Sequence, residues 1–224
     1  VLRHLDWAIA TEDSLNLISA GNSAQSPALF GSSYNGIYVG ITGGTSGKFT
    51  PAIDHVYQAF RQRPDVVAPE IHTSNGTAVV SSVVASLAQA AKNPAFSKSG
   101  SNNAFTRLQN AERSEVMKAM LMAAADRYTQ NTRPNTRIRN SEGEVVLDEN
   151  GLAQTITTYI VDYRGHALLS TDNGLDVSYG AGQVNIYNSY QILSSGEQDS
   201  LEDGGDTTVS LLGFDYDDAF GNGS

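Results

Sequence analysis

Short apolar runs alternate along the first part of this chain with stretches of helical periodicity. Three of these runs are rich in apolar and β-branched residues and are bounded by glycine, proline or polar residues, which predicts buried strands. The runs are Leu15–Ile18, Ile37–Ile41 and Asp65–Ala68. Pro69 ends the third run, because proline has no N–H to donate to a strand ladder.

Apolar residues three and four positions apart predict helices before and after these strands. Leu2, Leu5 and Ile9 predict a first helix, a stripe from Val79 to Ala91 predicts a long second one, and residues 114–128 predict a third. Helices that alternate with short apolar strands are typical of an α/β fold with a mostly parallel sheet. Residues 136–162 are rich in β-branched residues, which predicts an insertion that carries a hairpin.

The negative charge of the chain is concentrated near its C-terminus. The formal net charge is −10, from 24 acidic and 14 basic residues, and residues 194–224 hold eight of the acids and no Lys or Arg. Residues 1–193 therefore carry 16 acids against all 14 bases. We expect a folded body over 1–193 and an acidic tail or linker over 194–224.

Composition narrows the classes of function. A chain this acidic is not expected to take nucleic acid as its main partner. No apolar run approaches the roughly 20 residues of a membrane span, and no charged-then-apolar signal segment opens the chain. A length of 224 residues suits one sizeable domain, and the absence of cysteine rules out disulfides and Cys-ligated zinc.

Two patterns that could bind a cofactor lack the residues that binding needs. Gly43–Lys48 is glycine-rich like a phosphate loop, but Thr42 and Phe49 stand where that motif requires Gly and Ser or Thr. We therefore expect a surface turn there. The four histidines show no metal-ligand spacing; they are His4, His55, His72 and His166. No metal site and no cofactor are predicted from these residues.

The segment Asn75–Leu87 follows the third predicted strand and leads directly into the long helix. The start of a helix presents unpaired N–H groups and a dipole that favours negative charge. Such a turn suits a nucleophile whose reaction generates an oxyanion. On this segment alone, the ordinary start of a helix, with Asn75 or Thr77 as its N-cap, is the better interpretation.

Five motifs follow one another along about 190 residues: Ser19–Asn22, Tyr38–Thr42, Asp65–Pro69, Asn75–Leu87 and Tyr179–Asn185. In sequence and order they resemble motifs of the subtilisin-like serine peptidases, the subtilases. In that family the first ends a strand with the oxyanion-binding Asn, and the fourth is the nucleophile box. Residues 113–126 also resemble the helix that the family places between the fourth and fifth motifs.

The resemblance implies a subtilisin-like three-layer α/β fold and a serine endopeptidase that acts on peptides or proteins. It implies that Asn22 and the backbone N–H of residue 78 hold the oxyanion. Ser19, Ala20 and Gly21 match the strand that lines one wall of the substrate pocket. It further implies a secreted bacterial protein, extracellular or in the cell envelope. Calcium is a possible ligand in the family, but no oxygen-ligand loop of recognisable spacing occurs here.

The departures from the family determine what the chain can do. Ala78 stands where the family has its nucleophilic Ser, while Ser82 and Ser86 replace a Pro and a Gly. The family's Asp and His motifs do not occur in these 224 residues. An alanine methyl cannot attack a carbonyl, and no base is present to activate one. We therefore predict that the chain is inactive as written.

The resemblance covers the second part of a catalytic domain, so the fold is expected to be incomplete without an N-terminal segment or a second chain that completes it. Three explanations of Ala78 remain open: an engineered knock-out, a natural pseudoprotease, or either of these with the upstream half as a separate segment. The added loss of the Pro and the Gly at Ser82 and Ser86 favours natural drift. The function is accordingly an inactive endopeptidase domain or a peptide-binding or assembly module.

Overall fold

A computed structural model describes most of the folded body and part of the acidic segment. The described residues are 1–22, 29–42, 63–97, 109–127, 129–137, 144, 146–152, 154–160, 175, 179–199 and 208–217. The Gly43–Lys48 turn, His55 and His166 lie outside them.

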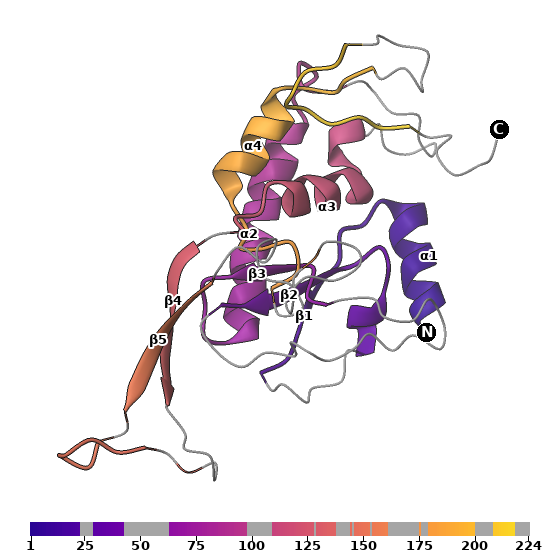
Figure 1. Cartoon of the computed structure of the whole chain (residues 1–224). Coiled ribbons are helices and arrows are strands. Elements are labelled where there is room, and N and C mark those ends of the chain that lie inside the picture. Colours follow the sequence, from indigo (N-terminus) through magenta and orange to yellow (C-terminus); the bar gives the residue numbers. More distant parts are fainter. Residues whose placement is uncertain are drawn as a thin grey trace.

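The fold is a mixed α/β arrangement around a small parallel sheet (Figure 1). The sheet has the order β1-β2-β3, from Leu17–Ser19, Ile37–Ile41 and Val66–Ala68. Leu17 pairs with Ile37, and Val39 pairs with Val66, both in parallel register. The three predicted strands and their parallel pairing are confirmed.

The long helix α2, Thr73–Ala91, packs on this sheet. It begins six residues before the apolar stripe predicted from Val79. Gly76 in its first turn allows the helix to lie close to β2. A Cβ at Gly76 would lie 2.9 Å from Ile41 Cγ2 and 3.3 Å from the carbonyl oxygen of Gly40. Only glycine lets the first turn of the helix approach the end of β2 so closely.

One apolar core joins the sheet to three helices. Helix α3 spans Ser114–Ala123, and helix α4 spans Ile186–Ser194. Buried side chains of α2, α3 and α4 meet those of β2 and β3; they include Val39, Val66, Val80, Leu87, Met117, Leu121 and Leu193. Helix α1, Leu2–Glu12, precedes the sheet and confirms the first predicted helix. Helix α3 ends five residues before the predicted limit at 128.

A long hairpin extends away from the rest of the fold (Figure 1). Its antiparallel strands are β4, Thr129–Arg137, and β5, Thr155–Ile160. The hairpin predicted for 136–162 is therefore present, but its first strand begins seven residues earlier. The turn near the tip is closed by Asp148, whose carboxylate accepts the N–H groups of Asn150 at 2.8 Å and Leu152 at 2.9 Å.

Part of the acidic segment lies against the body rather than in solvent. The N–H of Glu197 donates to the carbonyl of Phe96 at 3.0 Å. Within the segment, the N–H of Gln198 donates to the carbonyl of Phe214 at 2.7 Å, and the N–H of Phe214 donates to the carbonyl of Gly196 at 3.2 Å. Phe214 and Tyr216 pack on the core. The boundary at 193 remains a prediction, but residues 196–198 and 214–216 do not behave as a free linker.

Among the helices that the structure describes, none combines the length and the apolar character needed to cross a membrane.

Candidate functional site

The carboxyl end of β1 and the start of α2 are joined by a chain of hydrogen bonds. The hydroxyl of Ser19 donates to Thr73 Oγ1 at 2.7 Å, and the Thr73 hydroxyl donates to Asn22 Oδ1 at 2.8 Å. The backbone N–H of Thr73 also donates to Asn22 Oδ1, at 2.8 Å. Asn22 therefore caps α2 from outside the helix, since His72 at the N-cap makes no side-chain capping bond.

Ala20 is buried at the centre of this junction and fixes the strand end. Its N–H donates to the carbonyl of Val39 at 2.9 Å, and its carbonyl accepts the Tyr38 hydroxyl at 3.1 Å. Burial raises the pKa of Tyr38 to about 12, because the phenolate form would be poorly solvated there. Gly21, half-buried, then leads to the exposed Asn22.

Ala78 lies on the exposed side of α2. It is the sixth residue of the helix, which begins at Thr73. Only the first four N–H groups of a helix lack a partner within it. The helix therefore starts earlier than the predicted turn at 75–78, and neither Asn75 nor Thr77 is its N-cap.

The structure brings Ser19 and Asn22 together at Thr73, and Ala20 and Gly21 lie between them. The Asn22 side chain is bonded to Thr73, which lies five residues before Ala78. That Asn22 and the N–H of residue 78 together hold an oxyanion remains a prediction. Thr73 is the residue that the sequence analysis missed. Its signal is the run Thr73–Asn75, three residue types common at helix starts, directly ahead of the predicted helix.

The chain was compared with protein families, with curated proteins and with solved structures. None matched. The function of the site is therefore argued from its residues and their geometry.

No three histidine or carboxylate groups of the described residues come together as a metal site would require. A cavity of about 560 Å³ lies elsewhere, between the end of α3 and α4. Its lining includes Asp126, Asn188 and Leu212, and none of the residues predicted for the site.

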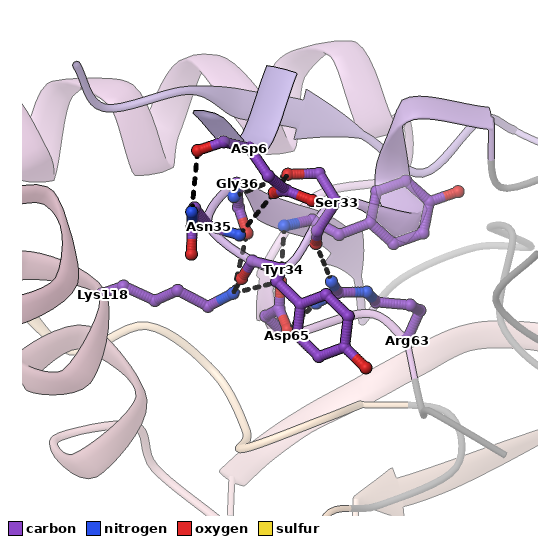
Figure 2. Close-up of polar contacts among 9 residues, drawn as sticks. Asp6, Ser33, Tyr34, Asn35, Gly36, Arg63, Asp65 and Lys118 are labelled. Atoms are coloured by element: carbon purple, nitrogen blue, oxygen red, sulfur yellow. Dashed lines mark hydrogen bonds and ion pairs between the residues drawn. The ribbon is translucent and has the colours of Figure 1, made fainter. Parts of the chain in front are cut away.

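A second polar cluster lies at the opposite end of the sheet, where β3 begins (Figure 2). Asp65 is at its centre and is bonded to the buried guanidinium of Arg63. The second carboxylate oxygen of Asp65 accepts the N–H of Tyr38 at 2.8 Å and lies 3.6 Å from Lys118 Nζ. Lys118 also donates to the carbonyls of Tyr34 and Gly36, at 2.7 and 2.8 Å. These contacts attach α3 to the loop before β2.

The same loop is attached to α1 by a buried carboxylate. Asp6 Oδ1 accepts the Ser33 hydroxyl at 2.6 Å and the N–H of Asn35 at 2.9 Å. The Asn35 side chain returns a hydrogen bond to the Asp6 carbonyl at 2.9 Å. These hydrogen bonds join α1, α3 and the start of β3 to the loop before β2, which indicates a structural role for the cluster.

Proposed function

We propose that this chain is a subtilase-type serine endopeptidase domain that is catalytically inactive as written. The observation that carries the proposal is the junction of β1 and α2 at the carboxyl end of a parallel sheet. Open α/β sheets bind ligands at this end of their strands. The junction has the exposed amide of Asn22, fixed by Thr73, and the exposed helix surface that bears Ala78.

This arrangement can bind a peptide but cannot cleave it by a covalent route. Amide groups and the polar start of a helix can donate hydrogen bonds to a peptide carbonyl. Acyl transfer needs a nucleophile and a general base, and a methyl group at Ala78 supplies neither. Ser19, Ala20 and Gly21 would then form one wall of the groove beside the bound peptide.

A second candidate function is a peptide-binding or assembly module that evolved from such a domain. Among the described strands, β1 pairs on one side only, with β2. An open strand edge favours pairing with another strand, here an N-terminal segment or a second chain that completes the sheet. Ser82 and Ser86, which depart from the family pattern, favour this natural origin over a single engineered change at Ala78.

Restoring the hydroxyl should not restore activity. In this chain, Ala78→Ser should hydrolyse a succinylated Ala-Ala-Pro-Phe anilide no faster than the unchanged protein. Because the family's His motif is absent, the new hydroxyl would have no base to take its proton, and binding with oxyanion stabilisation alone gives only a small residual rate. With a 4-nitroanilide as the substrate, the 4-nitroaniline released by hydrolysis is followed by absorbance and measures the rate.

Ala85→Ser is the matched control, because it adds a hydroxyl to the exposed surface of the same helix, two turns further along. Hydrolysis by Ala78→Ser that Ala85→Ser lacks, and that a serine-directed phosphonate blocks, would show that a functional base is present. The claim of inactivity would then be wrong.

A further inference from the structure

The acidic segment is attached to the body at Glu197, whose N–H donates to the carbonyl of Phe96, and again at Tyr216. The Tyr216 ring lies beneath the guanidinium of Arg113, whose Cζ is 4.6 Å from the ring centroid. A cation over an aromatic face is attracted by the ring quadrupole, more strongly when water is excluded. Tyr216 also packs against the apolar core. Arg113 therefore helps to hold residues 208–217 in place.

The same guanidinium holds the end of α1. Arg113 Nη1 lies 3.3 Å from Asp13 Oδ2, and the two side chains are only 14% and 16% exposed. Asp13 ends α1 in the left-handed conformation, with φ of 49°, which is uncommon for a residue other than glycine. The Arg113 contact therefore helps to hold an unfavourable helix end.

The carboxylate of Asp13 is poorly solvated in this position. Its Oδ1 is buried and accepts no hydrogen bond from the described residues. The pKa of Asp13 lies above its usual value: burial raises it, the negative charge of Glu115 also raises it, and Arg113 lowers it. A carboxylate that is poorly solvated depends on its cation, so any change that moves the guanidinium is felt at the end of α1.

We propose that Arg113 couples the docking of residues 208–217 to the anchoring of α1. When Tyr216 leaves the guanidinium, Arg113 loses its aromatic contact and becomes more hydrated, and its hold on Asp13 weakens. When the Asp13 carboxylate is lost, Arg113 loses its ion pair, and its hold on Tyr216 weakens. The two segments, about 200 residues apart in the sequence, thus open together. Coupling of this kind is reciprocal.

Hydrogen exchange of the whole chain, followed by mass spectrometry, tests this coupling. Tyr216→Ala should speed exchange in residues 208–217 and, by about fivefold, in the last turn of α1. Tyr216→Phe keeps the ring beneath Arg113 and should speed exchange in both regions far less than Tyr216→Ala does. Asp13→Asn should in turn speed exchange in residues 208–217. The core amides of α2 from Val80 to Leu87 report global stability and should change in none of these variants.

Faster exchange at 208–217 in Tyr216→Ala, with α1 unchanged, would overturn the coupling. So would an Asp13→Asn variant whose residues 208–217 exchange at the original rate. If the α2 core also exchanges faster, the exchange at α1 is compared with it, and equal acceleration counts against the coupling.

Discussion

Asp65→Ala should lower the free energy of unfolding by about 3–5 kcal/mol, the usual cost of leaving a buried charge without its counter-charge. Arg63 is 2% exposed, and the Asp65 carboxylate that it faces is 5% exposed. Removal of the carboxylate also takes away the acceptor of the Tyr38 N–H, at the start of the central strand. Urea unfolding followed by circular dichroism measures the loss.

Glu149→Ala is the control for Asp65→Ala. Glu149 is an exposed acid in the hairpin turn, and its removal should change stability by no more than about 0.5 kcal/mol. A loss of less than about 1 kcal/mol for Asp65→Ala would mean that Arg63 is solvated in the folded protein. That result would contradict the burial of Arg63 and Asp65 in the cluster shown in Figure 2.

Gly182→Ala should have a comparable effect by a different mechanism. Gly182 has φ of 126°, and an added Cβ would overlap the carbonyl oxygen of Asp126 and lie 2.8 Å from its carbonyl carbon. Backbone strain costs about 1–3 kcal/mol, and overpacking adds about 1–3 kcal/mol. The carbonyl of Gly182 also accepts the N–H of Val67 at 2.9 Å, so a shift would disturb β3. Thermal and urea unfolding measure the sum.

Gly151→Ala separates the two contributions. Gly151 also has a positive φ, of 74°, but a Cβ there meets nothing within 4 Å. Gly151→Ala should therefore lower the free energy of unfolding by the backbone strain alone, about 1–3 kcal/mol. If Gly182→Ala is no more destabilising than Gly151→Ala, segment 179–185 does not pass as close to the end of α3 as the structure places it.

The parts of the fold that the sequence predicts are those determined by local apolar pattern. Val66–Ala68 and Ile37–Ile41 are short runs with no competing helical period, so their strand character is visible locally. Their parallel pairing follows from the helices that alternate with them. The hairpin is predicted by its β-branched residues. The predicted start of its first strand is too late, because Thr129–Asn135 has no apolar alternation that would indicate a strand.

Two features that the sequence analysis missed, the start of α2 and the docking of the acidic segment, depend on contacts between distant residues. Thr73 becomes the first residue of α2 because Asn22, 51 residues earlier, accepts its N–H. Helix α4 does carry a local signal, since the Asn185 side chain accepts the N–H of Asn188 as an N-cap. The sequence does not predict the packing of Phe214 and Tyr216 on the core, because the acidic residues around them are typical of a solvated segment.

The central claim concerns the junction of β1 and α2, and an NMR titration tests it most directly. The uniformly ¹⁵N-labelled chain is titrated with the same succinylated Ala-Ala-Pro-Phe anilide to millimolar concentration. We expect chemical-shift changes in Ser19–Asn22, including the Asn22 side-chain amide, and in Thr73–Ala78. We expect weaker binding in Asn22→Ala and unchanged binding in Asn188→Ala, which alters an Asn on α4. An absence of shifts at this junction, or shifts confined to other surfaces, would contradict the assignment of the site.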